Sequence, residues 1–271
     1  MTIPPTHIII FLLTVFIYTI NTGAYAARLA GVRTGHPTLA GSLFNVLDLG
    51  ARGANALLTP LVGSITDLAA NTQNTADLLS TYRLLLLAAS VGTIAAALFI
   101  PTLSRLLARG VSSYETRRSL PEVVVNATSV QGLWRARHSL AAPRISVLRE
   151  LRRSPFPKRF LLASVLVTAI AAVSNAATLY ASALVPEGAR TATSLGPMLS
   201  GFGMILTIFV INPVAAITVD EALRDRRPLK DVTYITVWQV GAQLVGTLAA
   251  QALLFPASWV VVQITRLLIN L

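Results

Sequence analysis

The stretch LLLLAASVGTIAAALFIPTLS, residues 84–104, contains no charged residue and lies between Arg83 and Arg105. An α-helix needs roughly 20 consecutive apolar residues to cross the hydrocarbon core of a bilayer, and this stretch supplies them. Its apolar residues follow one another without the apolar–polar alternation of an outer-membrane strand. The stretch therefore predicts a membrane-spanning helix and places the chain among the helical membrane proteins.

The rest of the 271-residue chain has the same character, with 54% hydrophobic and only 12% charged residues. A soluble domain would carry roughly 25% charged residues. We predict an all-α polytopic membrane protein with about six transmembrane helices. The expected spans are 7–27, 38–66, 81–104, 160–184, 193–219 and 232–255. A further apolar stretch, 257–271, follows Pro256 and is short for a crossing, so we expect a kinked extension or an interfacial segment.

The basic residues gather in alternate loops between these spans. Of 22 in the chain, two lie between spans 1 and 2, twelve from Arg105 to Arg159 and four from Arg224 to Lys230. By the positive-inside rule these loops face the cytoplasm and both termini lie outside. The formal net charge of +11 then reflects membrane topology, and no nucleic-acid partner is predicted.

The sequence lacks the motifs of several enzyme classes. It has no cysteine, no G-x-x-x-x-G-K-[ST] phosphate loop, no H-E-x-x-H metal motif and no G-x-S-x-G nucleophile motif. Its three histidines, His7, His36 and His138, are scattered along the chain. We therefore predict a protein that is not an enzyme and that uses no metal and no cofactor.

The two halves of the chain match each other at an offset near 154, the distance from Asn21 to Asn175. The other matching pairs, in the same order, are PLVGSITD (60–67) with PVAAITVD (213–220), VGTIAA (91–96) with VGTLAA (245–250), and Pro101 with Pro256. Each half holds three spans, so the second half enters the membrane from the opposite side. This is the 3+3 inverted-topology repeat of many secondary transporters. The alternative is a duplication that only doubled a helical hairpin.

These patterns divide the chain into three units. Residues 1–110 form the first three-helix repeat, 111–158 a basic cytoplasmic linker, and 159–271 the second repeat with the C-terminal extension. Within the linker, Ile145, Leu148 and Leu151 share one helical face and arginines surround it. Such a helix would lie on the inner surface, attracted by anionic membrane lipids. The alternative is that these charges only set the topology.

A polar stripe interrupts the second span, in LFNVLDLGARGANALLTPLVGSITD, residues 43–67. Asn45, Asp48, Arg52 and Asn55 follow at steps of three or four residues and so share one helix face. A charge deep in a span costs about 2.5–3.5 kcal/mol on insertion scales, unless it meets a wet cavity or other protein. The Asp–Arg pair either neutralises itself and holds helices together, or binds a phosphate through the planar guanidinium. We favour the second interpretation and predict a substrate site at these four residues.

Other polar positions are candidates for the same site. Asn21 lies in span 1, and Arg28 and Arg33 lie at its inner end, where they would meet an anion first. The second half offers Asn175, Asn212 and Asp220. Hydrogen bonds between helices are the alternative role for the asparagines, and topology alone accounts for the two arginines.

Three segments, ARLAGVRTG (27–35), SLFNVLDLGARGAN (42–55) and PLVGSITD (60–67), resemble the Amj family, Alternate to MurJ. The resemblance implies a multi-pass protein of the bacterial inner (plasma) membrane that acts as a lipid II flippase in peptidoglycan synthesis. Its substrate would be a polyprenyl pyrophosphate that carries a disaccharide-peptide.

Transport from the inner to the outer leaflet would then proceed by alternating access of the two halves, without ATP hydrolysis. One alternative is a non-transporting membrane scaffold that recruits cell-wall synthesis enzymes. A lipid-modifying enzyme is a weaker alternative, because the motifs for such chemistry are missing. Six helices are few to enclose so large a head group, so we also predict a homodimer.

Overall fold

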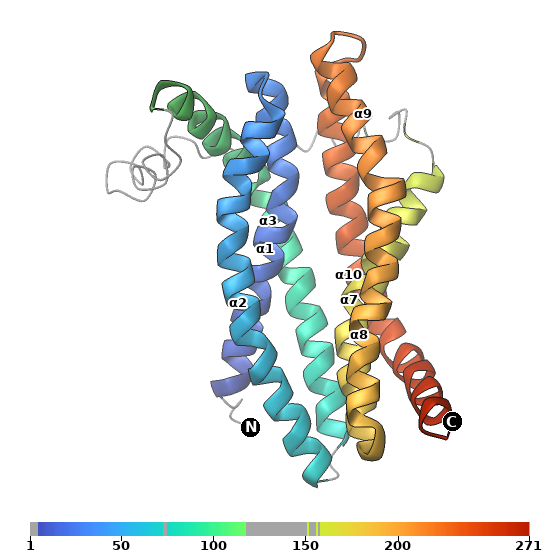
Figure 1. Cartoon of the computed structure of the whole chain (residues 1–271). Coiled ribbons are helices and arrows are strands. Elements are labelled where there is room, and N and C mark those ends of the chain that lie inside the picture. The colour runs from blue at the N-terminus through green and yellow to red at the C-terminus, as the bar shows by residue number, and fades with distance from the viewer. Residues whose placement is uncertain (1–4, 73–74, 118–150, 152–155, 157, 271) are drawn as a thin grey trace.

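The computed structural model describes residues 5–72, 75–117, 151, 156 and 158–270, and it is all helical over these residues (Figure 1). The helices are α1 (Pro5–Thr34), α2 (Pro37–Thr72), α3 (Thr75–Arg117), α7 (Lys158–Leu184), α8 (Ala189–Leu206), α9 (Asn212–Leu223) and α10 (Leu229–Ile269). A 3₁₀ turn, Pro186–Gly188, precedes α8, and a π-helical turn, Thr207–Ile211, joins α8 to α9. When α8 and α9 are counted as one helix, all six expected spans are confirmed to be helical.

Among the described residues, and with α8 and α9 counted as one helix, every helix except α2 is long and apolar enough to cross a membrane. Helix α2 is long enough, with 36 residues, but it carries the polar stripe, and no stretch of it is apolar enough to be counted with the others. The class of polytopic helical membrane protein is therefore confirmed, and the helix that departs from it carries the predicted site.

Two helices continue beyond the predicted limits. Helix α3 runs to Arg117, past the predicted end of the first unit, and α10 runs through Pro256 to Ile269. Figure 1 shows the C-terminal turns of α10 directed away from the rest of the bundle. A proline inside a helix removes one backbone hydrogen bond and bends the axis. The stretch after Pro256 is thus a bent continuation of α10, and its position in the membrane or at the interface stays a prediction.

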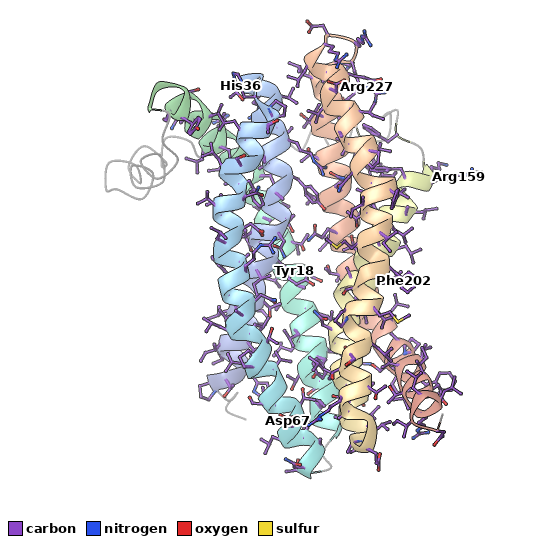
Figure 2. The ribbon with its side chains drawn as sticks, viewed as in Figure 1. Tyr18, His36, Asp67, Arg159, Phe202 and Arg227 are labelled. Atoms are coloured by element: carbon purple, nitrogen blue, oxygen red, sulfur yellow. The ribbon has the colours of Figure 1, made fainter. Side chains whose placement is uncertain are left out.

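The two halves run in opposite directions. In Figure 1, α1 and α3 rise from the end where both termini lie, whereas α7 and α10 descend toward that end. His36, Arg159 and Arg227 lie toward the opposite end, while Asp67 lies at the end of the termini (Figure 2). Both termini therefore share one side of the bundle, as an even number of crossings requires, and the three labelled residues His36, Arg159 and Arg227 share the other.

Packing inside the two halves is equivalent. Helix α1 packs most extensively on α3, and α7 packs most extensively on α10. Gly92 of α3 lies against α1, where an added Cβ would come within 2.5 Å of the Val15 carbonyl oxygen. Gly246 of α10 lies against α7, where an added Cβ would come within 3.0 Å of the Val165 carbonyl oxygen. These are the glycines of the two VGT motifs, so the sequence match corresponds to the same close helix contact in each half.

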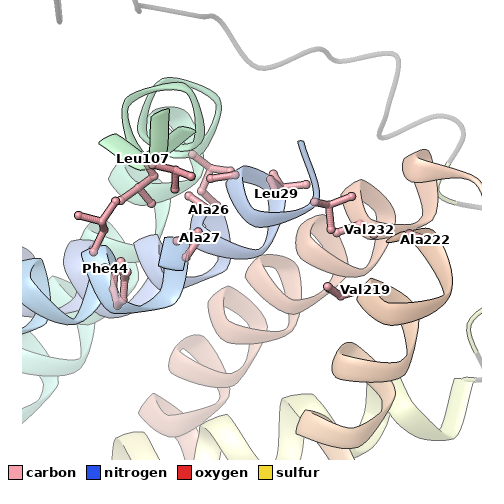
Figure 3. Packing of buried hydrophobic residues seen from close by; sticks show 14 of the residues in the cluster. Ala26, Ala27, Leu29, Phe44, Leu107, Val219, Ala222 and Val232 are labelled. Carbon is pink, nitrogen blue, oxygen red and sulfur yellow. The ribbon is translucent and has the colours of Figure 1, made fainter. Parts of the chain in front are cut away.

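Two apolar clusters join the halves near the two ends of the bundle. The first combines the end of α1 with the start of α2, the later part of α3, and Val219 and Val232 from the second half (Figure 3). The second combines the end of α2 and the start of α3 with α7, and includes Tyr82 and Tyr180, whose rings meet edge to face at 6.3 Å. The halves therefore touch at both ends, and the predicted site lies along the helices between these contacts.

Of the predicted amphipathic face, Ile145 and Leu148 lie outside the described residues, whereas Leu151 packs against the apolar cluster that contains Phe156 and Phe160. The division at 111–158 stays a prediction.

Candidate functional site

The charged pair of α2 is formed as predicted. Arg52 Nε donates to Asp48 Oδ2 at 2.7 Å. The Arg52 side chain is 76% exposed and the Asp48 side chain 21% exposed, although Arg52 lies near the middle of a helix that runs from Pro37 to Thr72. A guanidinium exposed to hydrocarbon at that depth would be costly. The exposed face of α2 around Arg52 is therefore expected to be wet, and the guanidinium keeps donors that the aspartate does not occupy.

The two asparagines of the stripe flank this pair. Asn45 and Asn55 are both exposed, and neither side chain makes a hydrogen bond to another described residue. Their amides are thus available to a ligand. Asn21, on α1, is also exposed.

Arg28 and Arg33 do not lie free at an open mouth. The Arg28 guanidinium donates from Nη1 to Oε1 of Gln239 on α10, and it stacks over the Tyr25 ring with 5.4 Å to the ring centroid. Arg33 Nη1 donates to Ser104 Oγ on α3 at 2.9 Å. Arg28 therefore links the two halves, whereas Arg33 links two helices of the first half. Their contact with a substrate stays a prediction.

A cavity of about 290 Å³ lies where α1, α2 and α3 meet α7 and α8. Asn55 brings the α2 stripe to it, and Asn175 of α7 also lines it. Its other polar lining residues are Thr14, Tyr18, Thr59, Tyr82, Thr178 and Thr193. None of the lining residues is charged, so the cavity is polar but neutral, and it lies one turn along α2 from the charged pair.

Sequence reasoning missed most of this cavity. Of the residues in the predicted site, only Asn55 lines it; Asn175, a secondary candidate, also does. One weak indication in the sequence connected Tyr18 with the site, because Tyr18 lies one turn from Asn21 on the same helix. The contact between Ser90 Oγ and Thr247 Oγ1, at 2.9 Å, was also missed; it links α3 and α10 beside their VGT glycines.

Comparison with known proteins identifies the family of the chain. The profile of the family described as Amj, Alternate to MurJ, matches residues 13–265. The chain belongs to the Amj family. The match covers both halves of this Amj-family chain, so the resemblance seen over residues 27–67 extends through the second half.

One curated relative is similar to the chain over nearly its whole length. The chain is 28% identical to Lipid II flippase Amj of Bacillus subtilis (strain 168) over 258 residues, which cover 95% of this chain and 96% of the relative. No solved structure matches the chain. Among the described residues, no group of three or more His, Asp or Glu is placed to hold a metal ion.

Proposed function

We propose that this Amj-family protein is a lipid II flippase that moves the precursor from the inner to the outer leaflet. The observation that carries the proposal is Arg52, an exposed guanidinium held by Asp48 in the middle of α2 beside a polar cavity between the halves. The relative from Bacillus subtilis carries the name lipid II flippase, and the pyrophosphate of such a lipid is the ligand that a planar guanidinium suits.

Transport proceeds by alternating access between the two halves. The head group enters from the cytoplasm, where Arg28 and Arg33 attract it, and its pyrophosphate then competes with Asp48 for Arg52. The polyprenyl chain stays in the bilayer throughout. The opposite directions of the two three-helix halves supply the symmetry on which alternating access depends.

No ATP is needed to give the movement a direction. An inside-negative membrane potential favours outward movement of an anion by about 2.3 kcal/mol per charge per 100 mV. The free energy of a pyrophosphate therefore falls as it crosses from the cytoplasmic to the outer face of the bacterial plasma membrane. In this proposal both termini face outside and two chains pair as a homodimer.

The Arg52→Ala variant is expected to lose at least about tenfold in transport, because removal of a charged hydrogen-bonding group costs about 1.5–3 kcal/mol. The measurement is lipid II on the outer face of cells that depend on this protein alone, at matched membrane levels. Arg52→Lys keeps the charge but loses the planar fork, so it should recover only part of the rate.

Arg224→Ala is the matched control, because Arg224 forms the same kind of i,i+4 pair with Asp220, at 3.2 Å, at the exposed end of α9. It should transport like wild type. Wild-type transport by Arg52→Ala would refute the assignment of Arg52. If purified wild type in vesicles moves no lipid II while cells still need the basic segment 111–158, the protein acts as a scaffold for cell-wall enzymes instead.

A further inference from the structure

The cavity between the halves has a closed floor and an open mouth. Tyr82 and Thr14 are buried at its floor, whereas Asn55, Asn175 and Thr193 are exposed and line its mouth. The mouth is thus shared by α2 of the first half and by α7 and α8 of the second. A ligand that enters it contacts both halves at once.

The polar groups at the cavity suit a neutral hydroxylated ligand. Over the described residues, the Asn55 and Asn175 amides and the Tyr18 hydroxyl make no hydrogen bond, so they are available to a ligand. The Thr59 hydroxyl donates to the backbone carbonyl oxygen of Asn55 at 2.8 Å and keeps its lone pairs for an incoming donor. Amides and hydroxyls beside an aromatic ring bind sugar hydroxyl and acetamido groups, whereas a cavity without a cation is a poor site for a phosphate.

The size of the cavity limits the ligand to one ring. Its volume of about 290 Å³ is at the lower end of the roughly 300–1,000 Å³ found for small-molecule pockets. Tyr18, which lines the cavity and is labelled in Figure 2, lies midway along α1 between the two ends of the bundle. The cavity therefore has room for a single sugar and not for a disaccharide with its peptide.

The spacing along α2 connects this cavity to the charged pair. Asn55 follows Arg52 by three residues, which is a rise of about 4.5 Å along the same side of the helix. In a polyprenyl pyrophosphate glycolipid the first sugar is bonded directly to the pyrophosphate. We propose that the cavity binds this first sugar ring while Arg52 holds the pyrophosphate, an inference that rests on the proposed function.

The test compares two ligands in detergent micelles: lipid II, and a polyprenyl pyrophosphate that carries no sugar. Asn175→Leu should raise the Kd for lipid II about tenfold, the loss of one or two polar contacts, and change the Kd for the sugar-free lipid less than about twofold. Arg52→Ala should raise both. Tyr18→Phe, which removes only a hydroxyl, repeats the test with minimal change in packing.

Asn270→Leu, a change at the exposed end of α10, is the matched control and should bind both lipids like wild type. Equal shifts for the two lipids in Asn175→Leu and Tyr18→Phe, or no shift for either, overturn the sugar site. Wild type that binds the sugar-free lipid as tightly as lipid II also overturns it. Wild type that shows the expected Kd pattern but moves neither lipid across vesicles refutes the proposed function and leaves the sugar site standing.

Discussion

Gly92→Ala is expected to destabilise the folded protein, although alanine is the better helix former. The added Cβ would lie 2.5 Å from the Val15 carbonyl oxygen and 2.9 Å from the Tyr18 Cβ, and backbone atoms cannot move aside without separating α1 from α3. Overpacking of this kind costs typically about 1–3 kcal/mol, and more where backbone is involved. We expect the melting temperature of the detergent-solubilised protein to fall by about 5 °C or more.

Gly246→Ala in α10 is expected to destabilise the protein in the same way, because the added Cβ would lie 2.6 Å from the Thr168 Cβ. Gly63→Ala in α2 and Gly241→Ala in α10 are the controls, since an added Cβ meets nothing within 4 Å at either position. There the gain in helix propensity, up to about 1 kcal/mol, should raise the melting temperature slightly. If Gly92→Ala melts like these controls, α1 and α3 are not in the close contact described.

The sequence predicted the number and direction of the helices because both depend on local composition. Runs of about 20 apolar residues mark the spans, and an odd number of spans in each half requires the inversion. It did not predict that α1 packs mainly on α3, because helices that are apolar on all sides do not reveal which face meets a neighbour. The glycine of each VGT motif was the available signal, since close helix contacts in membranes use small residues.

Two local features also escaped sequence reasoning. Pro256 indicated a bend but not whether the helix would continue, and α10 continues to Ile269. The π-helical turn at Thr207–Ile211 comes just before Pro213, whose ring nitrogen has no hydrogen to donate, so the backbone hydrogen-bond pattern must change there.

Part of the candidate site could likewise be predicted from the sequence, and part could not. The Asp48–Arg52 pair was predictable because its two residues are one turn apart on one helix. The partner of Arg28 was not, since Gln239 is 211 residues away in sequence and carries no charge to indicate it. The neutral cavity needed the structure, because Tyr18, Asn55 and Asn175 come from three helices and meet only after the halves pack together.

Gln239→Glu is expected to reduce transport about tenfold or more while leaving the protein at least as resistant to heat. Arg28 of the first half donates to the Gln239 side chain, which is 2% exposed and whose Nε2 has no partner among the described residues. A carboxylate would replace this unpaired donor with a second acceptor, and a bond with both partners charged is roughly twice as strong as a neutral one. The halves would then be held together at the end where alternating access requires them to part and free Arg28 for the head group. The measurements are initial transport rates in vesicles and melting temperatures.

Gln239→Leu shows whether transport depends on how strong the bond from Arg28 is or only on whether the bond is present. Leucine removes the acceptor and leaves the Arg28 guanidinium buried against α10 without it, which should lower stability by about 1–3 kcal/mol. The two variants therefore change stability in opposite directions, and only Gln239→Glu should combine a stable fold with slow transport. Wild-type transport by Gln239→Glu would show that the halves do not part between Arg28 and Gln239. Equal loss of transport in both variants would assign the function to the amide itself, because a stronger and an absent bond would then have the same effect.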